Sequence, residues 1–122
     1  PEWIAHRRRI AALYRQGLSG VGELRLPHFD QPRYYDSYQN YVVRTDARDR
    51  LRAYLKEQAV ETLVHRPKPM WEHSGLGLAT PAAPETEALC REVLSSPMSA
   101  ETTDDHVATT VACLQSFFST KP

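Results

Sequence analysis

Apolar residues recur every three to four positions in four stretches of the chain and crowd together in two shorter ones. The first pattern is typical of helices that bury one face. The second, rich in β-branched and aromatic residues, is typical of strands. Along the chain the two patterns follow the order helix, strand, helix, strand, helix, helix. This order predicts an α+β fold, with a small antiparallel or mixed sheet and helices packed mainly on one face.

A strand–helix–strand unit in the middle of the chain carries the clearest pattern. Residues 41–45 predict the first strand and residues 60–64 the second. Between them, the carboxylate of Asp46 suits the free N–H groups at the start of a helix over residues 46–58. Its apolar stripe consists of Leu51, Tyr54 and Leu55. The helix is long enough to return the chain in either direction, so it leaves the relative direction of the strands open.

Three further helices are predicted around this unit. Residues 3–17 form the first, with Gly17 as a stop. Pro84 suits the first turn of the second helix, and Thr103 caps the third. Their inward faces consist of Ile10, Leu13, Tyr14 and Leu18 in the first, Leu89, Val93 and Leu94 in the second, and Val107, Val111, Leu114 and Phe118 in the third. Residues 66–84 form the longest irregular segment, of a length that is usually functional or disordered.

Length and charge narrow the classes of partner. At 122 residues the chain is expected to form a single domain. Fifteen Lys and Arg residues balance fifteen Asp and Glu residues, so charge gives no reason to expect nucleic acid or an anionic membrane as partner. The basic run from Arg7 to Arg9 spreads over most of a helical turn, and we interpret it as a solvated face. No apolar run is long enough to span a bilayer, and no signal peptide is visible.

The cysteines and histidines predict neither a disulfide framework nor a metal site. Cys90 and Cys113 lie on apolar helical stripes, so we expect buried free thiols and a cytoplasmic protein. His65 and His73 are eight residues apart, and no histidine pair has the spacing of metal ligands. The nucleophile motif Gly-x-Ser-x-Gly of serine hydrolases is absent from the sequence. The chain starts without Met in a helical pattern, which suggests a piece of something longer or a processed protein.

Four segments of the chain resemble segments of a known enzyme family and follow one another in the same order as in that family. They are RRRIAALYRQGL, YVVRTDARDRLRAYL, VETLVHRPKPMW and ETEALCREVLSSPMSAETTDDHVATTVACLQSFF. Together they resemble the C-terminal small domain of the DegT/DnrJ/EryC1/StrS aminotransferases, which use pyridoxal phosphate to aminate keto sugars on nucleotide carriers. The resemblance implies a helix over residues 1–18 that links to a large catalytic domain absent here. Residues 19–122 would then be the α+β small domain of a fold-type I enzyme.

The resemblance also implies partners and a cofactor for the parent enzyme. These are the large catalytic domain or its subunit, a second copy in a homodimer, a nucleotide-sugar substrate, and glutamate or glutamine as amino donor. Without the large domain, we expect bare apolar surface around Trp3, Ile10, Tyr14, Tyr34, Tyr35 and Tyr38.

The chain itself lacks residues suited to pyridoxal phosphate chemistry. A Schiff-base lysine must be desolvated. Lys56 is predicted on the wet face of a helix, Lys68 stands between prolines, and Lys121 is next to the C-terminus. No Gly-rich turn is suited to a phosphate. We therefore expect no catalytic residue and no cofactor in this chain, and pyridoxal phosphate in the parent.

His65 is the first candidate substrate-binding residue. It matches the histidine of the family's histidine-tyrosine-proline motif, which lies near the sugar-nucleotide site, although a histidine that merely ends a strand explains the sequence too. The tyrosine of that motif is Arg66 here, and a guanidinium suits a nucleotide phosphate. Trp71 offers a flat face to a base or a sugar, and packing is the alternative.

Gln39 and Asn40 complete the predicted site. If the two strands run antiparallel, as the resemblance favours, Tyr38, Gln39 and Asn40 lie beside His65 and Arg66. If the strands run parallel, the two groups lie at opposite edges of the sheet. A non-catalytic binding or interaction module that retains the fold stays open as an alternative function. It is favoured by departures from the family pattern at Ala59, Arg66 and Ser96, where the family has glycine, tyrosine and leucine.

Overall fold

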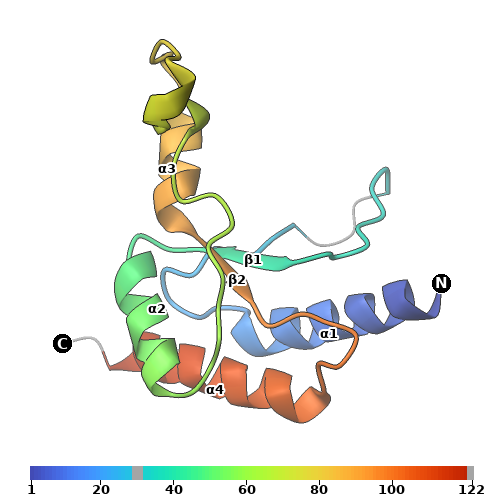
Figure 1. Cartoon of the computed structure of the whole chain (residues 1–122). Coiled ribbons are helices and arrows are strands. Elements are labelled where there is room, and N and C mark those ends of the chain that lie inside the picture. Colours follow the sequence, from blue (N-terminus) through green and yellow to red (C-terminus); the bar gives the residue numbers. More distant parts are fainter. Residues whose placement is uncertain (29–31, 121–122) are drawn as a thin grey trace.

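The computed structural model describes residues 1–28 and 32–120. The helices and strands are α1 (Glu2–Leu18), β1 (Tyr41–Arg44), α2 (Arg48–Glu57), the 3-10 turns η1 (Met70–Glu72) and η2 (Ser74–Leu76), α3 (Pro84–Glu92), β2 (Val93–Ser96) and α4 (Asp104–Ser119). Helices α1 and α4 lie side by side, β1 and β2 cross above them, and α3 extends away from the body (Figure 1). These elements confirm an α+β fold with a small antiparallel sheet.

The sheet consists of two strands with an isolated bridge on each side. β1 pairs antiparallel with β2, from Tyr41 opposite Ser96 to Arg44 opposite Val93. Arg25 bridges Arg44 on the outer edge of β1, and Leu63 bridges Ser95 on the outer edge of β2. Because both Leu63 and β1 are antiparallel to β2, the segment around Leu63 runs parallel to β1, with β2 between them.

Two predictions about the strands are therefore wrong. Residues 60–64 form no strand, since only Leu63 exchanges backbone hydrogen bonds with Ser95, at 3.2 and 2.8 Å. The second strand of the sheet is β2. The apolar pattern had predicted that the preceding helix continues through Val93 and Leu94, but these two residues begin β2. Helix α3 ends at Glu92, where the guanidinium of Arg48 donates to the carbonyls of Cys90 (3.0 Å) and Val93 (3.1 Å). This buried arginine satisfies carbonyl groups at the junction of helix and strand.

The ends of α2 differ in how well the sequence predicted them. Asp46 does not cap the helix; it pairs with Arg25 at 3.1 Å, and the residue before the helix is Ala47. Ala59 has a φ of 60°, the left-handed conformation expected from the glycine that the family places there. The N–H of Val60 donates to Leu55 (2.8 Å) and that of Ala59 to Lys56 (3.0 Å), which closes a Schellman motif.

The other two helix starts agree with the sequence. Pro84 opens α3. Thr103 caps α4, where its side chain accepts from the N–H of His106, and Nδ1 of His106 accepts in turn from the N–H of Thr103, both at 3.2 Å. This is a capping box with histidine in the place of glutamate.

The core lies between α1, α4 and the sheet. It consists of Ile10, Ala11, Tyr14 and Leu18 from α1, Tyr41, Val43 and Leu94 from the strands, Leu51 and Leu55 from α2, and Val107 and Leu114 from α4, with Leu24, Tyr38 and Val60. Gly17, predicted as a stop, lies inside α1, and a Cβ there would stand 2.6 Å from Val111 of α4. Glycine therefore permits the close approach of the two helices. None of the described helices has the length and hydropathy that crossing a membrane requires.

The expectation of bare apolar surface is half correct. Trp3, Tyr34 and Tyr35 are 75, 71 and 72% exposed. Ile10, Tyr14 and Tyr38 are buried instead, because they pack in the core against the sheet. Among residues 1–28 and 32–120, the exposed aromatic side chains thus lie in the first turn of α1 and in the segment before β1.

Candidate functional site

The segment that leads into β1 carries the predicted residues Gln39 and Asn40. Both are exposed. The preceding residue, Tyr38, is buried and has a φ of 51°, a conformation that costs energy in any residue with a Cβ. The carboxylate of Asp36 accepts from the N–H of Tyr38 at 2.7 Å and stabilises the turn. Backbone strain of this kind is often found at functional sites.

Two arginines of α1 hold this segment in place. The Arg7 guanidinium donates to the carbonyls of Tyr38 (3.1 Å) and Gln39 (2.7 Å). Arg8 donates to the carbonyl of Asp36 (2.7 Å) and lies 4.0 Å from the centre of the Tyr35 ring. The interpretation of this basic run as a solvated face is therefore wrong for Arg7 and Arg8. One signal was available, since Arg7 precedes buried residues of α1 at helical spacings of three, four and seven, namely Ile10, Ala11 and Tyr14.

Buried tyrosines lie beneath the segment. The rings of Tyr14 and Tyr41 stack with their centres 4.8 Å apart, and Tyr38 lies 6.3 Å from Tyr41. The Tyr14 hydroxyl donates to the carbonyl of Pro97 at 2.7 Å, and burial raises its pKa to about 12. Burial, and then the neighbouring Tyr38, raise the pKa of Tyr41, whose buried hydroxyl has no hydrogen-bond partner among the described residues. These groups thus stay neutral and serve packing.

Asn40 lines a hollow of about 300 Å³ at one end of the sheet. Its other walls are formed by Glu61, Thr62, Leu63, Ser95, Ser96, Pro97, Met98, Ser99 and Thr102. Many of these residues carry hydroxyl groups, and an amide beside hydroxyls can donate to and accept from a neutral polar ligand. Ser96, where the family has leucine, is buried and opposite Tyr41 in the sheet.

His65 and Arg66 lie at the other end of the sheet from Asn40. Val42 and Leu63 both stand opposite Ser95, so Asn40 is two residues before this level and His65 two residues beyond it. At about 3.3 Å per residue, the two are separated by roughly 13 Å along the strands. The predicted antiparallel cluster of these residues is therefore wrong. Both His65 and Arg66 are exposed.

Trp71 belongs to a third location. Trp71 lies in η1 and is half-buried. Pro69, the residue before η1, is buried. The structure therefore brings together Gln39 with Asn40, and His65 with Arg66 as chain neighbours, but it does not unite the five predicted residues in one pocket. Their roles in substrate binding stay predictions.

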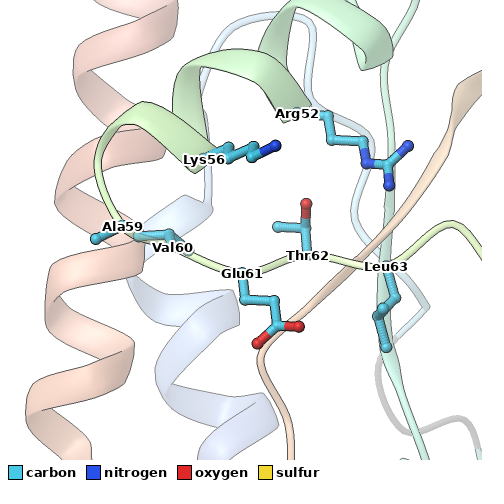
Figure 2. A pocket seen from close by; sticks show the side chains of 7 residues that line it. All are labelled: Arg52, Lys56, Ala59, Val60, Glu61, Thr62 and Leu63. Carbon is cyan, nitrogen blue, oxygen red and sulfur yellow. The ribbon is translucent and has the colours of Figure 1, made fainter.

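A second hollow, of about 480 Å³, lies beside the end of α2. Figure 2 shows Arg52 and Lys56 extending from the helix over Thr62, with Glu61 and Leu63 on the opposite wall. Lys56 is exposed there, as is Lys68 in its loop, and Lys121 lies outside the described residues. An exposed amine does not fit a Schiff base, which requires desolvation. The residues present in the described chain thus do not fit pyridoxal phosphate, and they include no group of three potential metal-binding side chains.

Comparisons with known proteins identify the relatives of this chain. The model of the DegT/DnrJ/EryC1/StrS aminotransferase family matches residues 1–115. A pleiotropic regulatory protein of Geobacillus stearothermophilus is 32% identical over 95% of this chain, and the dTDP-3-amino-3,4,6-trideoxy-alpha-D-glucose transaminase of Streptomyces venezuelae is 35% identical over 79%. Among solved structures, S. venezuelae DesV in complex with a ketimine intermediate matches 99% of this chain with a TM-score of 0.92 and 27% identity.

The matches cover only part of each relative. The chain spans 32% of the Geobacillus protein, 26% of the transaminase and 33% of the DesV chain, about a third or less of their lengths. The agreement in sequence and fold over nearly all of the chain nevertheless settles the relationship: this chain belongs to the DegT/DnrJ/EryC1/StrS aminotransferase family.

Proposed function

We propose that this chain is the C-terminal small domain of a pyridoxal-phosphate-dependent sugar-nucleotide aminotransferase and is not catalytic alone. The supporting observation is the match to DesV, which includes 99% of this chain but only 33% of the DesV chain. In the parent, a keto sugar on a nucleotide receives an amino group from glutamate or glutamine. The cofactor would supply the electron sink for this transfer, and the catalytic part of the parent would hold it.

The residues of this chain then bind and orient the substrate. Gln39 and Asn40 offer amide groups from one end of the sheet, and His65 and Arg66 offer an imidazole and a guanidinium from the other. Trp71 offers a ring face from η1. Because the two ends are separated, we assign them to different portions of an extended substrate, with Arg66 suited to a phosphate. The parent is proposed to be a cytoplasmic homodimer.

A chimera tests this function. The third of the S. venezuelae transaminase that matches this chain is replaced by the chain itself, and amination of the transaminase's own keto-sugar substrate is measured. We expect turnover by the chimera and none by the transaminase truncated before that third. Transamination by this chain alone, with added pyridoxal phosphate and glutamate, would contradict the proposal.

A binding module without catalytic function is the second candidate. It is favoured by Ala59, which keeps the left-handed backbone without the glycine that relieves its strain. The length of the gene product separates the two candidates. A product that carries a catalytic domain supports the aminotransferase, and a product of this chain alone supports the binding module.

A further inference from the structure

The hollow of about 480 Å³ between the end of α2 and residues 59–63 gathers hydrogen-bond donors. Arg52 and Lys56 are four residues apart and therefore share one face of α2, and both side chains extend over the hollow (Figure 2). From the opposite side, the hydroxyl of Thr62 points into the space between them (Figure 2). Two cationic groups and a hydroxyl thus converge from two segments of the chain.

The local structure of residues 60–64 fixes the direction of Thr62. Successive side chains of an extended segment point to opposite sides. Val60 and Val64 pack with the core, so Thr62, which lies between them, points to the same side, the side that α2 covers. Glu61 and Leu63 point to the other side (Figure 2). Thr62 is half-buried, and its hydroxyl has no hydrogen-bond partner among the described residues.

The two cations of the hollow lack an anionic partner. Neither Arg52 nor Lys56 forms a salt bridge with any described residue. Glu61, the carboxylate among the lining residues, is turned away from both (Figure 2). By contrast, Arg48, one turn earlier in α2, pairs with Asp49 at 2.7 Å. Like charges at this helical spacing repel each other, and an anion between them would relieve the repulsion.

The C-terminus of α2 does not present free carbonyl groups to an anion. Unsatisfied carbonyls give a helix end its partial negative charge. In α2, the carbonyls of Tyr54, Leu55 and Lys56 all accept from N–H groups of residues 58–60, at 2.8 to 3.1 Å. The motif that ends the helix thus reduces the main electrostatic obstacle to an anion in the hollow.

We propose that Arg52, Lys56 and Thr62 bind a phosphate group. Lysine supplies a compact charge, arginine a planar set of donors and threonine a hydroxyl, and together they suit the several acceptor oxygens of a phosphate. The zero formal net charge of the chain does not favour a long polyanion such as nucleic acid. The ligand is therefore a small one, either free phosphate or a phosphate monoester. The volume of the hollow is that of a small-molecule site and has room for both.

The site consists of residues of this chain, so its test does not depend on the proposed function. The chain is titrated with inorganic phosphate at constant ionic strength and followed by heteronuclear NMR. We expect saturable shifts of the Thr62 amide and the Arg52 side-chain Nε–H, with a dissociation constant on the order of 1 mM. Glycerol phosphate is the second probe, and glycerol is its neutral control. Tighter binding of glycerol phosphate than of phosphate assigns a monoester, and equal binding assigns free phosphate; both support the site.

Variants separate a binding site from general attraction by positive charge. Arg52→Met and Lys56→Met should each weaken phosphate binding about tenfold, because each removes a charge-assisted hydrogen bond. Thr62→Val keeps the shape of the side chain and should weaken binding about threefold. Arg50→Met is the matched control, since Arg50 lies on α2 outside the hollow, 6.0 Å from the centre of the Phe117 ring. It changes the net charge equally and should leave the affinity within about twofold.

Lysine labelling extends the test to the full-length gene product. Saturating phosphate should slow the acetylation of Lys56 several-fold and leave Lys68, which is exposed in its loop, unchanged in both proteins. Protection of Lys56 in this chain but not in the full-length product would overturn the proposal, because another surface would then cover the hollow. A linear response to phosphate without saturation would also overturn it, as would equal losses of affinity in Arg50→Met and Arg52→Met.

Discussion

At the scale of single residues, Ala59 shows how much backbone strain the fold tolerates. Its φ of 60° costs a residue with a Cβ about 1 kcal/mol. We predict that Ala59→Gly raises the free energy of unfolding by about 0.5–1 kcal/mol, measured by urea denaturation. Ala53→Gly, at an exposed position inside α2, should lower it by a similar amount. A loss of stability at both positions would mean that no strain is stored at Ala59.

Arg7 has a structural role that the charge pattern of the sequence did not predict. Its guanidinium donates to two carbonyls in the strained segment before β1, and hydrogen bonds from charged groups contribute about 1.5–3 kcal/mol each. Arg7→Met keeps the apolar stem, and the bond to Gln39 is exposed to solvent and contributes little, so we predict a loss of roughly 1–3 kcal/mol in the free energy of unfolding, about that of one such bond. Arg9→Met is the control, because Arg9 pairs with Asp104 at an exposed site and should contribute less than about 1 kcal/mol. Similar losses in both variants would contradict the distinction.

At the scale of elements, Tyr14 links α1 to the chain after β2. Because burial raises its pKa to about 12 from 10, the unfolded chain loses this proton first as the pH rises. The contribution of the Tyr14 hydroxyl to stability is therefore complete below pH 10 and is lost between pH 10 and about 12, about 3 kcal/mol for a shift of this size. Because burial raises the pKa of Tyr41 as well, Tyr14→Phe should reduce this fall without abolishing it in alkaline urea titrations, whereas Tyr34→Phe, at an exposed ring, should leave it unchanged. An equally steep fall without the Tyr14 hydroxyl would assign the effect to other groups.

The elements also show where sequence patterns are sufficient. The stripes in α1, α2 and α4 predicted those helices because their apolar residues recur at the helical spacings of three and four. The strands were ambiguous, since runs of four or five apolar residues suit a strand, a helix end or an extended edge equally well. Residues 60–64 have strand composition but lie at the sheet edge, with Leu63 half exposed. The true strand β2 contains Ser95 and Ser96, whose burial depends on pairing with β1 and leaves no local signal.

At the scale of the whole molecule, strand order decides how the candidate site can work. The residue types at positions 39, 40, 65, 66 and 71 were predicted from the sequence, but their separation follows from β2 lying between β1 and the segment of Leu63. No pattern within residues 38–71 contains that information, because the intervening strand comes from residues 93–96. A long-range pairing of this kind is fixed by the core as a whole.

From the separation of Asn40 and His65 we predict how the two residues affect kinetics in the full-length enzyme or in the chimera with the S. venezuelae transaminase. His65→Ala and Asn40→Ala should each raise KM or lower turnover, because each removes a polar group from the proposed substrate surface. Since the residues lie roughly 13 Å apart along the strands, the free-energy effects on kcat/KM should add within about 0.5 kcal/mol in the double variant. Gln39→Ala combined with Asn40→Ala, at neighbouring positions, serves as the coupled comparison. Unchanged kinetics in His65→Ala would remove that residue from the site, and coupling above about 1 kcal/mol between His65 and Asn40 would mean that they contact one portion of the substrate after all.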